Sequence, residues 1–194
     1  MKRYWLAGAA MLSVAGIAAV TQPELTNRTN TETAASLQLR VDLSARELQV
    51  IEGGDVVESY PVAIGKPSYP TPKGTFRIRR IIWNPRWVPP DSKWARNKIA
   101  RAPGDPKNPM GRVKIFFQEP DYYIHGTREV DSLGQAESHG CIRMRNSDVV
   151  SLAQRVMAAG GKPAEEGFIR RVINRVRSTR EVRLSNPVTF EVHS

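Results

Sequence analysis

Alternating apolar and polar residues from Leu37 onward most restrict how this chain can fold. Every second residue in this segment is apolar: Leu37, Leu39, Val41 and Leu43. Such a period of two predicts a half-buried β-strand. A turn at residues 44–46 and the pair Gly53-Gly54, which suits the positive φ angles of a two-residue hairpin turn, separate it from two further expected strands, residues 47–52 and 56–64. The domain is therefore expected to open as a β-meander and to be mainly β with a few helices.

Prolines and helical periodicity organise the next part. Many of the fourteen prolines lie between Pro67 and Pro109, which excludes long helices there and indicates one long Pro-rich loop. Residues 113–117 and 122–124 have the composition of strands. The clearest helix begins at Asn146, which can cap it, and ends at Gly160-Gly161. Its expected apolar face is Val149, Val150, Leu152, Ala153, Val156 and Met157.

Near the C-terminus, residues 165–178 combine apolar positions at helical spacing with several arginines, and residues 182–192 alternate as a closing strand would. The basic helix can pack against the domain or lie on an anionic surface. Three tryptophans of the Pro-rich segment, Trp83, Trp87 and Trp94, allow a similar choice between packing a loop and lining a groove for a sugar-peptide polymer.

The N-terminus has the pattern of an export signal. Two basic residues precede an apolar run, so residues 1–20 are expected to be a signal peptide or an N-terminal membrane anchor, and residues 21–36 a polar linker. The remaining residues, 37–194, suffice for one domain, expected to be monomeric and to lie in the periplasm or cell-wall space. The net charge of +10 predicts attraction to an anionic cell-wall or membrane surface, and export argues against nucleic acid as the partner.

Cys141 is the only cysteine, so it cannot form a disulfide within its own chain. Gly140 before it permits a sharp bend that exposes the sulfur and adjacent N–H groups, and His125, at the end of an expected strand, can serve as its base. A lone cysteine is more often a buried apolar residue. The polar surroundings favour a nucleophile, whose rate should then depend on a pKa in the histidine range. Zinc held by His125, His139 and Cys141 is a weaker alternative, because the spacing lacks a second cysteine or a compact histidine pair.

Two motifs, His125-Gly-Thr and Ser138-His-Gly-Cys-Ile-Arg-Met, resemble the signature of the L,D-transpeptidase catalytic domain family (YkuD-like), bacterial enzymes that remodel peptidoglycan. The segments Thr71-Pro-Lys-Gly-Thr-Phe76 and Asn108-Pro-Met-Gly111 resemble two further family motifs, in the family's order. The resemblance is strongest over residues 37–157 and leaves residues 163–194 as a C-terminal helix and strand extension. It implies a β-sandwich or barrel-like domain with a helix after the catalytic cysteine.

The resemblance also implies a reaction that needs no metal and no cofactor. Cys141 would attack the peptidoglycan stem tetrapeptide, release the terminal D-Ala and pass the acyl group to an amine, forming a cross-link or anchoring a protein. His125 would move the protons while the Gly126 carbonyl orients its ring, and N–H groups around His139, Gly140 and Cys141 would stabilise the oxyanion. The family is also generally acylated by carbapenems.

The remaining site residues have less defined roles. Arg143 can bind a substrate carboxylate or anchor the loop, and a mixed role is expected. Ser138 and His139 are expected to shape the loop rather than to carry protons. The charged stretch of residues 128–131 after the first motif departs from some family members and leaves the choice of acceptor open. Two alternatives persist: an L,D-carboxypeptidase with the same site, in which water is the acceptor, and a non-catalytic wall-binding module.

Overall fold

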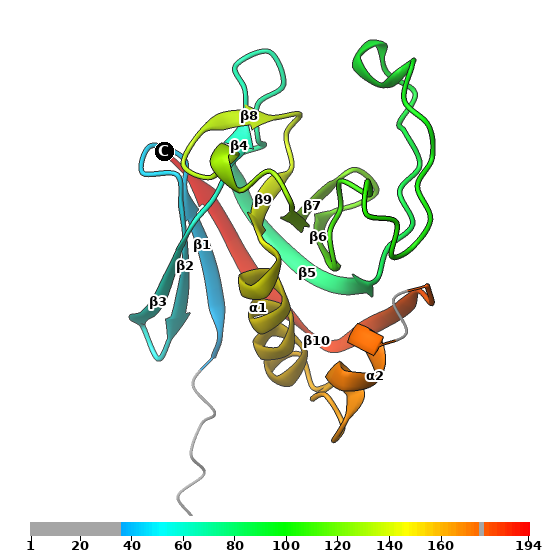
Figure 1. Cartoon of the computed structure of the whole chain (residues 1–194). Helices are drawn as coiled ribbons and strands as arrows, with labels where there is room; N and C mark the ends of the chain where they lie inside the picture. The colour runs from blue at the N-terminus through cyan, green and yellow to red at the C-terminus, as the bar shows by residue number, and fades with distance from the viewer. Residues whose placement is uncertain (1–35, 175–176) are drawn as a thin grey trace, which may run out of the picture. The chain divides into compact units, whose positions relative to one another are not determined.

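A computed structural model describes residues 36–174 and 177–194 (Figure 1). The expected leader, residues 1–20, and the expected linker up to residue 35 lie outside the described residues. Within the described ranges, no helix has both the length and the hydropathy that crossing a membrane requires.

The first three strands form the expected meander. β1 (Gln38–Asp42), β2 (Glu47–Glu52) and β3 (Asp55–Pro61) pair in an antiparallel manner. Gly53 and Gly54 form the connection between β2 and β3 with φ angles of 63° and 99°, a region that side chains rarely occupy. Local sequence alone therefore suffices to determine this part of the fold.

The sheet has eight strands in the order β3-β2-β1-β10-β5-β6-β7-β9. The strands after the meander are β5 (Gly74–Trp83), β6 (Val113–Gln118), β7 (Tyr122–Thr127), β9 (Ile142–Arg145) and β10 (Arg180–His193). The β1–β10 and β7–β9 pairs are parallel, and the other pairs are antiparallel. The expected C-terminal strand is thus present, and it lies in the middle of the sheet, where it joins the meander to the strands that carry the two motifs.

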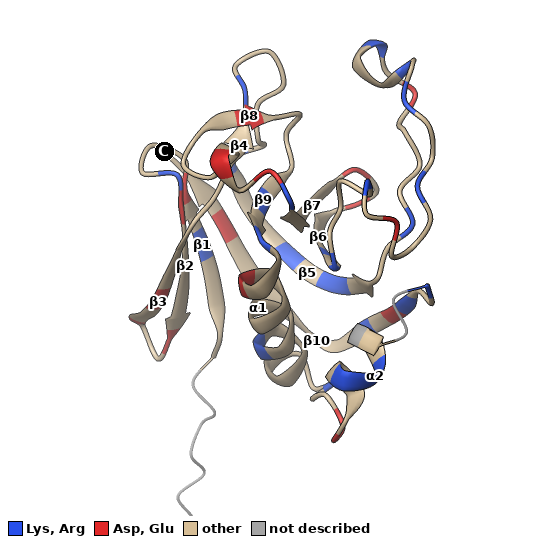
Figure 2. Cartoon of the chain, viewed as in Figure 1, with Lys and Arg blue, Asp and Glu red and all other residues tan. Residues whose placement is uncertain are grey.

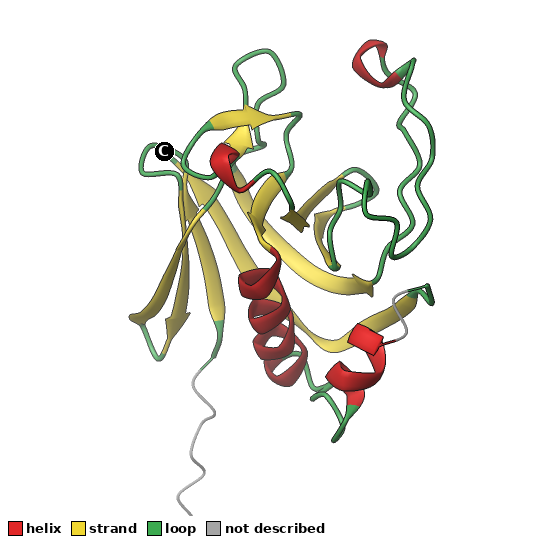
Figure 3. Cartoon of the chain, in the orientation of Figure 1, coloured by secondary structure: helices red, strands yellow, loops and turns green. Residues whose placement is uncertain are grey.

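The Pro-rich segment is a long loop only from residue 84 onward. Its earlier part contains the ten-residue strand β5, which the sequence did not predict (Figure 3). The buried residues Ile78 and Ile81 are three positions apart, so β5 lacks the strict alternation that identifies a strand. The interruption matches a register shift in β10 between Arg183 and Val188. A bulge of this kind hides a strand from a search for period two.

The helix α1 (Asn146–Ala159) packs against β6, β7 and β10 (Figure 1). Its buried face is Val149, Leu152, Ala153, Val156 and Met157, whereas the expected Val150 is only partly buried. The expected capping role of Asn146 was wrong: Arg145 takes the N-cap position, and Asn146 is the first helical residue. The Asn146 side chain instead accepts from Arg112 N (3.0 Å) and donates to the Thr127 carbonyl (2.9 Å), because these longer-range partners lie within its reach.

The helix α2 (Phe168–Asn174) is shorter than its periodicity predicts. Phe168 and Val172 are buried, and Phe168 meets the ring of Trp83 edge-on at 5.7 Å. Arg170 and Arg171 are exposed, which gives α2 a basic outer side (Figure 2). Its apolar side therefore packs against the domain, as one of the two interpretations expected.

The long loop of residues 84–112 is held at its base and along its length. Asn108 is buried, donates to the Pro85 carbonyl (2.8 Å) and accepts from Met110 N (3.0 Å). Trp87 and Arg101 pair through their backbones, so the two halves of the loop run side by side to the short helix η1 (Lys93–Ala95). A small parallel pair, β4 (Ile64–Gly65) with β8 (Ala136–Ser138), and the short helix η2 (Val130–Ser132) complete the elements.

Candidate active site

The two motifs meet on one face of the strands β6, β7 and β9. Ile115, Ile124 and Ile142 are fully buried on the opposite face, in the core beneath α1. Because side chains alternate along a strand, their sequence neighbours point the other way. We call this side the reactive face; it carries Lys114 and Phe116 of β6, Tyr123 and His125 of β7, Arg143 of β9, and Cys141 just before β9. The strand pairing therefore brings together residues that are far apart in the sequence.

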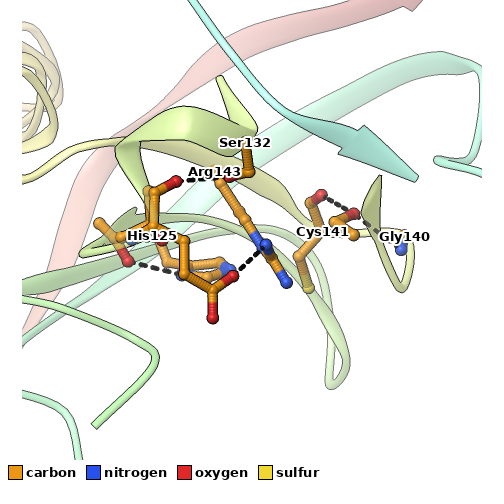
Figure 4. Close-up of polar contacts among 9 residues, drawn as sticks. His125, Ser132, Gly140, Cys141 and Arg143 are labelled. Atoms are coloured by element: carbon orange, nitrogen blue, oxygen red, sulfur yellow. Dashed lines mark hydrogen bonds and ion pairs between the residues drawn. The ribbon is translucent and has the colours of Figure 1, made fainter. Parts of the chain in front are cut away.

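His125 lies on the reactive face with 3% of its surface exposed. Its Nδ1 atom is 2.8 Å from the Gly126 carbonyl oxygen (Figure 4). A carbonyl can only accept, so Nδ1 carries the proton and the lone pair of Nε2 is left for use as a base. Burial, followed by the charges of Arg143 and Lys114, lowers the pKa of His125 to about 3, and the carbonyls of Gly126 and Pro109 act in the opposite direction. The ring is therefore neutral at physiological pH, outside the ordinary histidine range that the sequence led us to expect.

Cys141 is partly buried, and its thiol donates to the Asp121 carbonyl at 3.3 Å. Burial raises the pKa of Cys141 to about 11, although hydrogen bonds from the Tyr123 backbone and hydroxyl and the charge of Lys114 act to lower it. Among the described residues, no hydrogen bond joins Cys141 to His125. The resting site thus contains a neutral thiol and a neutral imidazole, and the thiol must turn from Asp121 before it can release its proton. Such bonds often form only when substrate is present.

The loop before Cys141 is held by Ser138. The buried Ser138 hydroxyl donates to the Cys141 carbonyl and accepts from Gly140 N at 3.1 Å (Figure 4). Gly140 has a φ of 101°, and a Cβ atom there would lie 2.8 Å from the ring of Tyr122. The sharp bend therefore requires glycine, and in the resting loop the Gly140 N–H is engaged by Ser138.

His139 lies between two aromatic rings. Trp94 of η1 stacks on it at 4.0 Å with an interplanar angle of 17°, and Tyr69 contacts it at 4.9 Å. Burial, followed by the charges of Lys66 and Arg143, lowers the pKa of His139. The long loop thus reaches the residue two positions before the nucleophile. The sequence suggested that Trp94 packs a loop or lines a groove, but nothing in the sequence identified His139 as its stacking partner.

Trp83 and Trp87 are buried, and the packing interpretation applies to both.

Arg143 is fixed by its backbone and by an acidic neighbour. Its N–H and carbonyl pair with Ala63 at 2.9 and 3.0 Å. Its guanidinium is 2.7 Å from the Glu129 carboxylate, which comes from the charged stretch after the first motif (Figure 4). The side chain therefore already binds a carboxylate, and a substrate carboxylate would have to share or displace Glu129.

The residues of the zinc alternative are not arranged as a ligand set. Within residues 36–174 and 177–194, no group of three His, Cys, Asp or Glu side chains is placed to hold a metal ion. His139 faces Trp94 and Tyr69, and Cys141 faces Asp121 and Tyr123.

Asn146 connects three parts of the site, and its loss should weaken the fold. It joins Arg112 to Thr127, two residues from His125, and a Cβ atom on Gly126 would lie 2.2 Å from its Oδ1 atom. We expect Asn146→Ala to lower the free energy of unfolding by about 1–3 kcal/mol, because a backbone donor and acceptor lose their partner. Chemical denaturation measures this loss.

Ser147→Ala is the matched control for Asn146→Ala, since Ser147 is exposed and, among the described residues, its hydroxyl bonds only to the neighbouring Asp148 carboxylate. We expect this variant to stay within about 0.5 kcal/mol of the unmodified protein. Equal losses for the two variants would contradict the role of Asn146.

Comparison with known proteins places this chain in a family. The family model of the L,D-transpeptidase catalytic domain, YkuD, matches residues 37–177. YkuD of Bacillus licheniformis, named as a candidate L,D-transpeptidase, is 34% identical over 116 residues, which cover 60% of this chain and 58% of the relative. YqjB of Bacillus subtilis strain 168, named in the same way, is 36% identical over 121 residues, covering 60% of this chain and 64% of the relative. The chain thus spans less than two thirds of each.

Solved structures agree in fold. The crystal structure of L,D-transpeptidase 3 from Mycobacterium tuberculosis matches with a TM-score of 0.51 at 15% identity, covering 82% of this chain and 62% of that one. The NMR structure of the catalytic domain of the E. faecium L,D-transpeptidase matches with a TM-score of 0.50 at 16% identity, covering 83% and 99%. With the family model matching most of its length, this chain belongs to the YkuD family of L,D-transpeptidase catalytic domains.

Proposed function

We propose that this protein is an exported cysteine acyltransferase that acts on peptidoglycan stem peptides as an L,D-transpeptidase. The observation that carries the proposal is the reactive face. The only cysteine lies there just before β9 and the buried His125 on the adjacent strand β7, with the Nδ1 proton of His125 held by the Gly126 carbonyl. Cys141 is the nucleophile in this proposal, and His125 is the base and then the acid.

The first half-reaction starts from two neutral groups. The thiol proton passes to Nε2 of His125, and the sulfur attacks the carbonyl carbon of the amide bond that precedes the terminal D-Ala. The N–H groups of His139 and Cys141 are candidates to stabilise the oxyanion, because the Gly140 N–H is engaged by Ser138. The C–N bond then breaks, the imidazolium returns its proton to the departing amine, and D-Ala leaves a thioester on Cys141.

The second half-reaction releases the enzyme. An incoming amine attacks the thioester carbonyl, loses a proton to His125 and forms a new amide as the C–S bond breaks, which regenerates the thiol. Water in place of the amine would give hydrolysis and an L,D-carboxypeptidase. Trp94 of the long loop stacks on His139, two residues before Cys141, which supports a role of the long loop in the choice of acceptor.

Charge supports an anionic substrate. The charges of Lys66, Arg143 and Lys98 all act on the pKa of His139, so positive charge gathers near the nucleophile, and stem peptides carry carboxylates. Lysines and arginines also lie along β5, α2 and the long loop (Figure 2). With the net charge of +10 and the export-like N-terminal pattern, these features fit a protein in the periplasm or cell-wall space near anionic polymers.

Incubation with a purified tetrapeptide-stem muropeptide tests the proposal. We expect release of D-Ala together with a cross-linked dimer, both detected by mass spectrometry. D-Ala release with no dimer, at high concentrations of an amine acceptor, would identify a carboxypeptidase instead. Retention of all D-Ala, with the muropeptide bound to the protein, would leave only a wall-binding module.

A further inference from the structure

Lys114 is a partly buried charged residue that the reaction described above does not use. It lies on β6 directly opposite His125 of β7, on the reactive face. Its Nζ atom is 4.3 Å from the centre of the Tyr123 ring. Hydrogen bonding by the same Tyr123 helps to lower the pKa of Cys141, and the charge of Lys114 acts on that pKa in the same direction.

Charged and titratable groups face Lys114 from every element around it. They are Arg80 on β5, Asp121 in the β6–β7 turn, Tyr123 and His125 on β7, and Cys141 and Arg143 at β9. Burial and the charge of Arg80 lower the pKa of Lys114, whereas Cys141 and Asp121 act to raise it; the net result is a pKa of about 8. The ammonium is therefore the main form at neutral pH, and the amine becomes the main form above pH 8.

The thiolate needs a cation that His125 does not supply at rest. A cysteine paired with an imidazolium gains much of its reactivity from that positive charge. Here burial keeps the His125 ring neutral, and its Nδ1 is committed to the Gly126 carbonyl. The cation on β9, Arg143, is bound to Glu129. Among the described residues Lys114 has no carboxylate within ion-pair distance, so no ion pair neutralises its charge.

We propose that Lys114 is the electrostatic partner of Cys141: its ammonium, held over the ring of Tyr123 on β7, stabilises the anionic sulfur, which lies just before β9 on the other side of β7. This proposal deepens the proposed function and rests on Cys141 being its nucleophile. Lys114 acts through the sulfur and is a positioning residue for charge. It forms no covalent bond, and the thiol proton still passes to His125.

The same charge acts on His125 in a way that suits the next step. Lys114 lowers the pKa of His125 and so makes its imidazolium a stronger acid. A proton taken from the thiol is then readily given to the departing amine. Lys114 therefore favours both the anionic nucleophile and the return of the proton.

Alkylation of the thiol by iodoacetamide across pH 5–10 tests the proposal without any substrate. Cys141 is the only cysteine, so every event reports on it. We expect Lys114→Met to slow alkylation at pH 7 by about ten- to a hundredfold, because the small thiolate fraction that reacts there loses the stabilisation of one nearby positive charge. Above pH 8 wild-type Lys114 is itself losing its charge, so the difference between the two proteins should shrink there.

Two further variants separate charge from packing. Lys114→Arg keeps a permanent charge, so it should match the wild-type rate below pH 8 and exceed it above. Arg80→Met is the control, because Arg80 also lies over an aromatic ring, 3.8 Å from that of Phe116, but is paired with Glu119. Its alkylation rate should stay within about twofold of the wild-type rate at pH 7.

An alkylation rate at pH 7 that is unchanged in Lys114→Met, or equally changed in Arg80→Met, would overturn the proposal. If Lys114→Met does not fold, Lys114→Arg decides: a profile above pH 8 identical to wild type overturns it. The proposed function is tested apart from this by D-Ala release from the muropeptide. Unchanged alkylation in Lys114→Met with normal release by the wild-type protein would refute only the role of Lys114, whereas slowed alkylation in Lys114→Met without release by the wild-type protein would refute only the transpeptidase.

Discussion

Replacement of Cys141 by alanine is expected to slow D-Ala release by more than about 10³-fold and to leave folding intact. The large loss follows because the thioester cannot form without the sulfur, and removal of a nucleophile typically costs several orders of magnitude. The small effect on folding follows because the one hydrogen bond that the thiol donates among the described residues is weak, to the Asp121 carbonyl. Release assays and thermal unfolding measure the two effects.

Carbapenem binding gives an independent readout for Cys141. Intact-mass spectrometry should show an adduct on the wild-type protein that maps to the Cys141 peptide and is absent from Cys141→Ala. Cys141→Ser is the matched control, since its hydroxyl can keep the bond to Asp121 but is a much weaker nucleophile. Activity of Cys141→Ala within tenfold of wild type would exclude Cys141 as the nucleophile.

Replacement of His125 is expected to reduce the acylation rate by about 10²–10⁴-fold, the usual contribution of general acid–base catalysis. His125→Asn separates chemistry from structure. Its amide N–H can still donate to the Gly126 carbonyl, but it has no basic nitrogen. Both His125→Ala and His125→Asn should therefore be inactive, while only the alanine variant should lose stability. An active His125→Asn would mean that the ring merely supports Gly126.

The pH dependence of the wild-type rate reports the pH range over which His125 can act as a base. The base must be unprotonated, and burial lowers its pKa to about 3, so His125 stays competent down to about pH 4. The rate should consequently show no loss centred near pH 6.5, the ordinary histidine value. Chelators should have no effect. A rate that vanishes on chelation would revive the zinc alternative.

Short-range patterns in the sequence predicted a large part of the fold. The alternation after Leu37 and the Gly53-Gly54 pair determine the meander, because hairpin pairing depends on neighbouring residues. The 3.6-residue period of α1 identified its buried face, apart from Val150. His125 and Cys141 could be brought into one site by the two motifs, but which side chains surround them depends on strand register.

Long-range pairing could not be predicted in the same way. The bulge opposite Arg183 breaks the pattern of β5, and nothing local to residues 182–192 indicates a central strand. Lys114 gave no signal, because its position beside the site follows from pairing with His125. Asn146 has the residue type of a helix cap, yet contacts with Arg112 and Thr127 decided its role. In each case the deciding partner is distant in the sequence.

The central place of β10 has a consequence for how the molecule assembles. β1 and β5 both pair with β10, and no direct pairing connects the meander to the other four strands. The two groups of strands are therefore joined only when residues 180–193 pair with both. The pairing of β1 with β10 closes a loop that contains most of the domain. Such high contact order predicts slow folding, because loop-closure entropy is lost before the contacts form. The complete sheet, including the strands around Cys141 and His125, can form only after β10 has paired. We therefore expect the reactive thiol to reach its native surroundings late in folding.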